Sequence, residues 1–286
     1  MYRCNCRGFC AGSIGRGGNQ SVKIINAKVD TSQFEDKHST DIRNRQSQLP
    51  YRINLGGFLD QPKINSVLGG FNIVCSINCK EKLDDRSGAA TSTRKTLANA
   101  YNGSYPYWID NKTLARILFA LENPPGSDTK YISGTTDSIG LVTKGITKLR
   151  YDTNQWWPSI IEQNNNLDQI KWLEKVLWLK QTHPRPNDLG SYLDFAQPNP
   201  LDIQSISRGT ELIWNAIQKY SLVELQEGMR KTYAGSNSMV SSFTTQEMHD
   251  QVVSYDGASI IGAGGGGYMI IASQERPENS IEFTIN

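Results

Sequence analysis

The sequence predicts an α+β protein in which strands and helices are mixed along the chain, preceded by an irregular N-terminal leader. Residues 69–82, "GGFNIVCSINCKEK", alternate in the period of a β-strand. Residues 111–123, "NKTLARILFALEN", have the spacing of an amphipathic helix. The chain closes on two short apolar or alternating segments, "YMIIAS" and "SIEFTI". Such mixing indicates an α+β or α/β domain.

The first half of the chain predicts one strong strand and two helices. The strand places one alternating set on a single face, namely Ile73, Cys75, Ile77 and Cys79. A first helix is expected in "TSTRKTLANAY", residues 91–101. The second helix aligns four apolar residues before Pro124 and Pro125 prevent its continuation, namely Leu114, Ile117, Leu118 and Leu121.

The second half is richer in helix. "IKWLEKVLWLKQT", residues 170–182, is ambiguous between a buried strand and a helix. Residues 209–233 read as helix in at least two pieces, and residues 246–257 as another helix. No internal repeat is evident.

Composition limits the function. The formal net charge of +2 provides no field that would argue for nucleic acid or an anionic membrane as partner. No signal-peptide h-region or long apolar run occurs, so we expect a soluble, cytoplasmic protein. Residues 1–47 are rich in small and polar residues and are expected to form a separate leader.

The five cysteines do not suggest a disulfide framework, because their number is odd and three of them crowd the N-terminus, Cys4, Cys6 and Cys10. A zinc site would need a fourth ligand, and none is close in sequence. Free thiols are therefore expected, including Cys75 and Cys79.

Three glycine-bearing loops are candidates for ligand binding. In "RINLGGFLDQP", Gly56 and Gly57 end an apolar segment and Asp60 follows; a plain turn explains this loop equally well. In "LDDRSGAATSTRKTLANA", small and hydroxyl residues stand directly before a helix, where free backbone N–H groups and the helix dipole favour a phosphate. The alternative is that Ser and Thr simply cap this helix.

The third loop, "SIIGAGGGGYMIIAS", has five glycines in residues 262–267. A tight turn between two strands needs fewer, so this loop predicts close approach of the backbone to a ligand or to a neighbouring loop. It lacks the Lys-Ser or Lys-Thr of a P-loop and the following βαβ unit of a Rossmann fingerprint.

Taken together, the three loops resemble the signatures of the GHMP kinase superfamily, which includes galactokinase, homoserine kinase and mevalonate kinase. "GGFLDQP" is similar to the "GGWTDTP" of the fucokinase and heptose kinase branch, "SGAATSTR" to the phosphate-binding "SGLGTSSA", and "GAGGGGYM" to the C-terminal "GAGGGGF". "SGTTDSIG" resembles the "GRQDQYA" segment that carries the catalytic aspartate in heptose kinases. The order and spacing agree over residues 48–286.

The resemblance implies a two-lobed α+β fold, with a ribosomal-protein-S5-like N-terminal lobe at residues 48–160 and a ferredoxin-like C-terminal lobe at residues 161–286. It implies an ATP- and Mg²⁺-dependent kinase acting on a sugar or sugar phosphate. Asp137 would be the catalytic base, Ser92 and Glu122 would hold magnesium, and the substrate would contact Gly57, Asp60, Gly264 and Gly265. The nucleotide would bind at Ser87, Gly88, Ala89, Ala90, Thr91, Ser92 and Thr93.

Some residues depart from the family pattern. Ala90 stands where a glycine is usual, and a methyl group there could crowd a phosphate or disfavour a positive φ. Arg94, Lys95 and Lys130 are cations near the presumed phosphates or on the solvated surface. His183 is expected to be an ordinary loop histidine. The adjacent Trp156 and Trp157 are expected either to stack on a ligand or to pack in the core.

Two questions stay open at the level of the sequence. "HSTDIRNR", residues 38–45, resembles the "STTDIR" motif of nucleotidylyltransferases, which implies a fused or partner transferase, although the "HxGH" motif is missing upstream. The alternatives to a sugar kinase are a diphosphomevalonate decarboxylase relative and a degenerate GHMP-fold protein that binds nucleotide or sugar without turnover.

Overall fold

A computed structural model describes residues 49–84, 86–125, 133–186, 192–240 and 243–286. The predicted leader, its nucleotidylyltransferase-like motif, Lys130 and the three N-terminal cysteines lie outside these ranges. All described residues belong to one compact unit that spans Ser39–Asn286. None of the helices in this part combines the length and apolar character that a membrane span requires.

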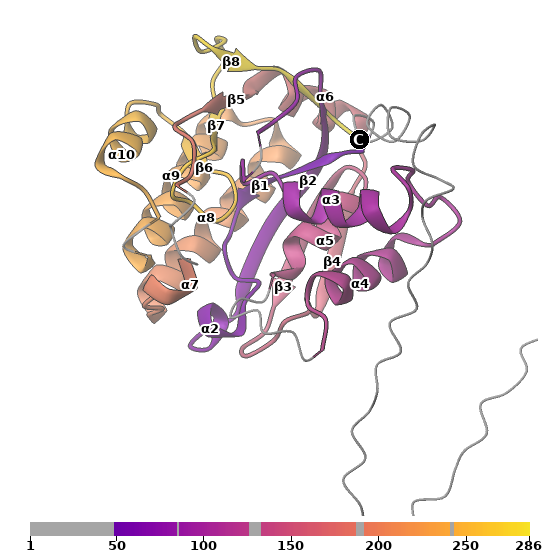
Figure 1. Cartoon of the computed structure of the whole chain (residues 1–286). Helices are drawn as coiled ribbons and strands as arrows, with labels where there is room; N and C mark the ends of the chain where they lie inside the picture. The colour runs from indigo at the N-terminus through magenta and orange to yellow at the C-terminus, as the bar shows by residue number, and fades with distance from the viewer. Residues whose placement is uncertain (1–48, 85, 126–132, 187–191, 241–242) are drawn as a thin grey trace, which may run out of the picture. The chain divides into compact units, whose positions relative to one another are not determined.

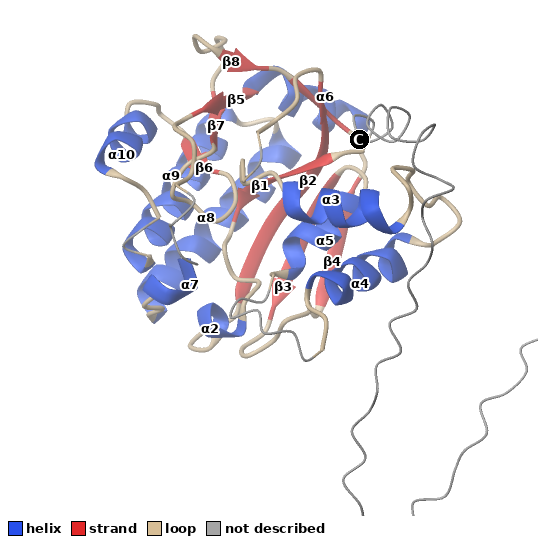
Figure 2. Cartoon of the chain, viewed as in Figure 1, coloured by secondary structure: helices blue, strands red, loops and turns tan. Residues whose placement is uncertain are grey.

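Strands and helices are mixed along the chain, as predicted (Figure 2). The first half contains β1 Tyr51–Gly56, α2 Pro62–Asn65, β2 Gly70–Cys79, α3 Thr91–Ala100, α4 Asn111–Glu122, α5 Thr135–Val142, β3 Ile146–Tyr151 and β4 Ile160–Asn164. The second half contains α6 Leu167–Val176, β5 Leu177–Gln181, α7 Tyr192–Phe195, α8 Pro200–Lys219, α9 Leu222–Met239, α10 Gln246–Val253, β6 Ala258–Ile260, β7 Tyr268–Ala272, β8 Ser280–Ile281 and β9 Phe283–Ile285.

The strands form two antiparallel sheets. The first has the order β1-β2-β3-β4, and β9 also pairs with β2. The second has the order β6-β7-β5-β8. The C-terminal segment belongs to both sheets, because β8 pairs with β5 and β9 with β2. The predicted boundary between lobes near residue 160 stays a prediction, and β4, which begins there, pairs within the first sheet.

Strand β2 is central because both of its faces are buried. Ile73, Cys75 and Ile77 belong to a core cluster that includes residues of α8 and α9, whereas Val74 belongs to a cluster that includes residues of α3, α4 and α5. Of these helices, α8 and α5 make the main contacts with β2. Alternate residues of a strand point to opposite faces, so this division follows from the period-2 pattern. Helices therefore cover the sheet on both sides, as Figure 1 shows.

Most predicted elements are confirmed, with two informative differences. The ambiguous segment at residues 170–182 is a helix followed without a gap by a strand, α6 and β5. In α4, Leu114 and Leu118 are buried, whereas Leu121, which the spacing places on the same face, is 48% exposed. The helix ends at Glu122, directly before Asn123 and the two prolines. Cys75 and Cys79 are free thiols, as expected.

Candidate active site

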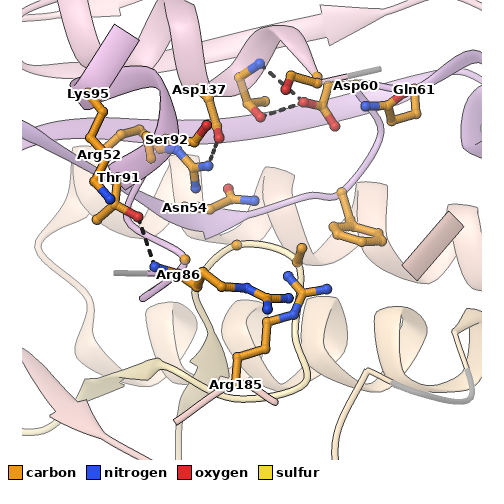
Figure 3. Close-up of a pocket in the computed structure, with 18 residues that line it drawn as sticks. Arg52, Asn54, Asp60, Gln61, Arg86, Thr91, Ser92, Lys95, Asp137 and Arg185 are labelled. Carbon is orange, nitrogen blue, oxygen red and sulfur yellow. Dashed lines mark hydrogen bonds and ion pairs between the residues drawn. The ribbon is translucent and has the colours of Figure 1, made fainter. Parts of the chain in front are cut away.

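One cavity of about 390 Å³ brings the predicted loops together (Figure 3). Its wall is formed by β1 and the loop that follows it, by the first turns of α3 and α5, by the loop after β5, and by the glycine-rich loop between β6 and β7. These segments are far apart in sequence. Their convergence is the main structural support for the motif-based prediction.

The phosphate loop, residues 87–93, approaches the cavity at the start of α3. Gly88, Ala90, Thr91 and Ser92 line the wall, whereas Ser87, Ala89 and Thr93 are buried beside it. Ala90 is the N-cap residue, and no side chain in the described part of the chain caps the helix. The first turn of α3 therefore leaves N–H groups for a ligand, and the interpretation of this loop as ordinary Ser/Thr capping is wrong.

Ala90 adopts the left-handed conformation, with φ 57° and ψ 35°. The sequence raised the concern that alanine could not take the positive φ of the usual glycine. The structure shows that it does, at the steric cost of about 1–2 kcal/mol that L-residues bear in this region.

The catalytic candidate Asp137 lies in the first turn of α5 and forms an ion pair with Arg52 of β1. Arg52 is only 4% exposed, whereas the Asp137 carboxylate is 29% exposed and borders the cavity. The start of α5 is fixed by Thr135, whose hydroxyl donates to the carbonyl of Trp156 at 2.8 Å and lies 2.8 Å from the Tyr151 hydroxyl. Burial, followed by the charge of Asp60, raises the pKa of Tyr151.

Asp60 is buried next to the same turn of α5. Thr136 donates to Asp60 Oδ2 twice, from its hydroxyl at 2.5 Å and from its backbone N–H at 3.2 Å. A Cβ atom on Gly134 would collide with this carboxylate, so glycine is required there for Asp60 to lie against the helix. The two acids that the motifs singled out therefore share one helix turn.

Asn54 adds a polar group that the motif comparison did not single out. Its Nδ2 donates to the carbonyl of Gly57 at 2.8 Å, which fixes the orientation of the amide. Its Oδ1 is buried and accepts no hydrogen bond from the described residues, although the side chain lines the cavity. A buried acceptor without a partner is costly, which makes this oxygen a candidate for a ligand's hydroxyl group.

Glu122 lies behind the phosphate loop at the end of α4. Ser92 Oγ donates to one carboxylate oxygen at 3.1 Å, and Thr93 Oγ1 donates to the other at 2.8 Å. Burial raises the pKa of Glu122, and these hydrogen bonds oppose that shift. Within the described ranges, no cluster of three or more His, Cys, Asp and Glu residues could hold a metal by itself. A hydroxyl and a carboxylate fit magnesium when phosphate oxygens complete the coordination.

The glycine-rich loop packs directly against the phosphate loop, as predicted. A Cβ atom on Gly262 would lie 2.6 Å from Gly88 Cα, and one on Gly267 would lie 2.5 Å from the Ser87 carbonyl oxygen. Gly262, Gly264, Gly265, Gly266 and Gly267 all have positive φ. The loop therefore needs glycine for backbone conformation and for close approach.

Three predicted substrate contacts lie slightly outside the cavity wall. Gly264 and Gly265 lie against Phe243, whose carbonyl accepts from Gly265 N at 2.8 Å, and Gly262 and Ala263 line the wall instead. Gly57 has φ 90° and accepts the hydrogen bond from Asn54. Their roles in substrate binding stay a prediction.

The cations near the site differ from those that the sequence suggested. Lys95 lines the cavity, but Arg94 points away, with its Nε donating to the Leu49 carbonyl at 2.9 Å and its guanidinium over the Tyr51 ring. Arg86 and Arg185 also line the cavity; Arg86 directly precedes the "SGAATSTR" motif, and Arg185 lies outside the family motifs. His183 lies in the loop after β5, where its carbonyl accepts from Gly267 N at 2.8 Å.

The paired tryptophans pack against α4 and do not line the cavity. Trp156 and Trp157 both contact Phe119, with ring centroids 6.3 Å apart in each case. The guanidinium of Arg116 lies 5.2 Å from the Trp157 ring centroid. Of the two interpretations of this pair, the structure supports packing.

No protein-family model and no curated protein matches the sequence. Solved structures match the fold. A D-glycero-D-manno-heptose 1-phosphate kinase from Bacteroides thetaiotaomicron is similar with a TM-score of 0.55 and 11% identity, covering 82% of this chain and 94% of that one. A Lactococcus lactis galactokinase, solved with galactose, has a TM-score of 0.54 and 14% identity, covering 79% and 84%.

Enzymes outside the sugar kinases match to a similar degree. A Streptococcus pneumoniae phosphomevalonate kinase, solved with phosphomevalonate and AMPPNP, has a TM-score of 0.52 and 10% identity, covering 79% of this chain and 91% of that one. At these identities the likeness concerns the fold. The chain therefore has the two-lobed α+β fold of the GHMP kinases, as its glycine-bearing motifs predicted.

Proposed function

We propose that this protein is an ATP-dependent kinase that phosphorylates a hydroxyl group of a sugar or sugar phosphate. The observation that carries the proposal is the meeting of the phosphate loop and the Arg52–Asp137 pair in one cavity. Phosphoryl transfer requires this combination, because the protein must hold the phosphates and orient the attacking hydroxyl.

The nucleotide phosphates would bind at the start of α3. The backbone N–H groups near Gly88, Ala90 and Thr91 border the cavity, and the helix dipole favours negative charge there. Lys95 lies one turn further along the same helix and also lines the cavity. It would add a positive charge next to the phosphates.

Asp137 would accept the proton of the attacking hydroxyl or orient that hydroxyl for attack. Its carboxylate is partly exposed to the cavity and is held in place by Arg52 from β1. The oxygen of the acceptor would attack the γ-phosphorus as the bond from that phosphorus to the bridging oxygen of ADP breaks. Arg52, buried beside the same carboxylate, would counter negative charge that develops on the transferring group.

The remaining polar groups suit an acceptor with several hydroxyls. Asp60 Oδ2 accepts both hydrogen bonds from Thr136, and the Asp60 side chain lines the cavity. Asn54 Oδ1 is the second buried acceptor. Two fixed acceptor oxygens in one cavity favour a ligand that donates two hydrogen bonds, as a sugar does.

Magnesium would be held by Ser92 and Glu122 together with phosphate oxygens. Bound there, the ion would supply positive charge that offsets the negative charge of the phosphates. Ser92 Oγ and Thr93 Oγ1 donate to the two carboxylate oxygens of Glu122, and the oxygens of all three groups keep lone pairs that a cation could use.

The second candidate function is a degenerate GHMP-fold protein that binds nucleotide without turnover. One observation favours it: Glu122 is engaged by two hydroxyls and does not line the cavity. Binding of ATP that does not depend on magnesium, without phosphorylation of any acceptor, would support this function.

The proposal can be tested by comparing ADP release by the wild type and by Asp137→Asn. We expect the variant to lose about 10²- to 10⁴-fold in turnover, the usual contribution of a general base. Because the change leaves the buried Arg52 without its ion pair, thermal unfolding must first show that the variant folds. Asp152→Asn, an exposed acid paired with Arg150, is the matched control. Full turnover by a folded Asp137→Asn variant would refute the mechanism.

A further inference from the structure

Among the described residues that line the cavity, basic side chains outnumber acidic ones. The charged residues that line it, within the described part of the chain, are Arg52, Arg86, Lys95 and Arg185 against Asp60 and Asp137. Arg52 is paired with Asp137, and Lys95 lies beside the phosphate loop on α3. Arg86 and Arg185 are therefore cations that the proposed phosphoryl transfer does not yet explain.

The position of Arg185 depends on the glycine-rich loop. Thr182 N donates to the Gly267 carbonyl at 2.9 Å, and Gly267 N donates to the His183 carbonyl at 2.8 Å. A Cβ atom on Gly266 would lie 2.7 Å from both the N and the Cα of Arg185. Glycine at this position thus allows the backbone of the loop after β5 to come close enough for Arg185 to reach the cavity.

Arg86 approaches the cavity from another segment of the chain, directly before the phosphate loop. Its backbone N–H donates to Thr91 Oγ1 at 3.1 Å, which ties it to the first turn of α3. In Figure 3 the side chains of Arg86 and Arg185 extend toward the same part of the cavity. Asn54 lies between these arginines and the acids Asp60 and Asp137 in that view.

We propose that Arg86 and Arg185 form an anion subsite that binds a phosphate group already present on the acceptor. The acceptor would then lie across Asn54, with its reacting hydroxyl at Asp137 and its phosphate between the two guanidinium groups. Paired guanidiniums suit a phosphate monoester, because each presents a planar fork of donors. The nucleotide phosphates have their own groups on α3, so they do not require these two arginines.

This inference rests on the proposed function and narrows it from a sugar or sugar phosphate to a sugar phosphate. In the reaction, the acceptor hydroxyl oxygen forms a bond to the γ-phosphorus of ATP, and ADP leaves. The hydroxyl proton passes to Asp137. The product is a sugar bisphosphate.

The first test compares hexoses with their 1-phosphates and 6-phosphates as acceptors. We expect kcat/KM to be about 10- to 100-fold higher for the phosphorylated acceptors than for the free hexoses. This factor corresponds to the free energy that charge-assisted hydrogen bonds to one phosphate group contribute. Arg185→Gln and Arg86→Gln should raise the KM for the acceptor by a similar factor and leave the KM for ATP unchanged. Arg208→Gln, an exposed arginine of α8 outside this cavity, is the control.

A second measurement does not need turnover. Inorganic phosphate is titrated by calorimetry into protein saturated with magnesium and a non-hydrolysable ATP analogue. We expect phosphate to bind the wild type, to bind Arg185→Lys more weakly, and to bind Arg185→Gln at least about tenfold more weakly. The main-chain hydrogen bonds of the loop do not involve the Arg185 side chain, so both variants should fold.

The outcomes separate the two proposals. Equal turnover of free and phosphorylated sugars, or a change of the ATP KM alone in Arg185→Gln, would overturn the anion subsite and leave the kinase intact. If no acceptor is phosphorylated, the kinase proposal fails, and the phosphate titration alone tests the anion subsite. Equal binding of phosphate to the wild type and to Arg185→Gln would overturn the anion subsite.

Discussion

The contact between the two glycine-bearing loops leads to the most specific structural prediction. Replacing Gly262 by alanine would place a Cβ atom 2.6 Å from the Cα and the carbonyl oxygen of Gly88, whereas ordinary contact begins at 3.4 Å. The loops would have to separate by roughly the difference, about 0.8 Å. Since both contacting atoms belong to backbone, no side-chain rotation can relieve the clash.

The loss of folding free energy in Gly262→Ala has two sources, backbone strain and overpacking. The backbone of Gly262 has φ 78°, where alanine is disfavoured by about 1–2 kcal/mol. Overpacking adds about 1–3 kcal/mol, and the reduced entropy of the unfolded chain returns up to about 1 kcal/mol. We therefore expect a net destabilisation of about 1–5 kcal/mol, which at about 2–4 °C per kcal/mol lowers the Tm by about 2–20 °C.

Function should suffer more than stability, because the displaced atom belongs to the phosphate loop. We expect the affinity for magnesium-ATP, measured by calorimetry below the Tm, to fall at least about tenfold, since a 1 Å misplacement can cost two orders of magnitude. Gly145→Ala is the control, because Gly145 has φ 72° and its Cβ would also clash with backbone, but far from the cavity. Equal nucleotide affinity in the wild type and Gly262→Ala would refute the reasoning.

Three further predictions concern the same cavity. Ala90→Gly relieves the strain of the left-handed backbone, but it removes a buried methyl group and gives the unfolded chain more conformational freedom. Because these effects oppose each other, the free energy of unfolding should change by less than about 1 kcal/mol. A larger loss of stability in thermal unfolding would contradict the assignment of strain to Ala90. Thr136→Val should raise the acceptor KM about tenfold with a smaller effect on kcat, because it removes the hydroxyl that donates to Asp60 and leaves only the backbone N–H of residue 136 as donor. Thr136→Ser keeps a hydroxyl and should restore the KM. Burial raises the pKa of Glu122, so its proton is bound more tightly in the folded state than in the unfolded one, and its contribution to stability is lost as the pH rises through the raised pKa. Glu122→Gln should therefore gain stability relative to the wild type as the pH rises through the pKa of Glu122. Magnesium-dependent nucleotide binding by the wild type should weaken as the pH falls through the same pKa, because Glu122 becomes protonated. Parallel pH profiles of stability for the two proteins would contradict this account.

Much of the fold could be predicted from local pattern. Strand β2 and helix α4 have clear periodicity, and proline ends the latter. The segment at residues 170–182 could not be assigned, because α6 passes directly into β5 and an apolar run contains both. Leu121 fits the helical pattern but lies exposed in the last turn. Periodicity gives a direction, whereas burial depends on what packs opposite.

The site could be predicted in part for a similar reason. The phosphate loop, Asp60 and Asp137 belong to short motifs, and they do meet in one cavity. Arg52 was missed although the sequence offers a signal, since an arginine inside the apolar strand "YRINLG" needs a buried partner. Arg185 offers no such signal. Its place depends on hydrogen bonds between loops more than eighty residues apart in the chain.

The central claim is that the cavity transfers a phosphoryl group to a sugar-type acceptor. The most direct measurement is ADP release by the purified protein with ATP, magnesium and a panel of fucose, galactose, mannose and their phosphates. We predict release that depends on one class of acceptor and on Asp137, with a phosphorylated sugar as product. The absence of acceptor-dependent release across the panel, despite measurable ATP binding, would contradict the claim and favour a degenerate member of this fold.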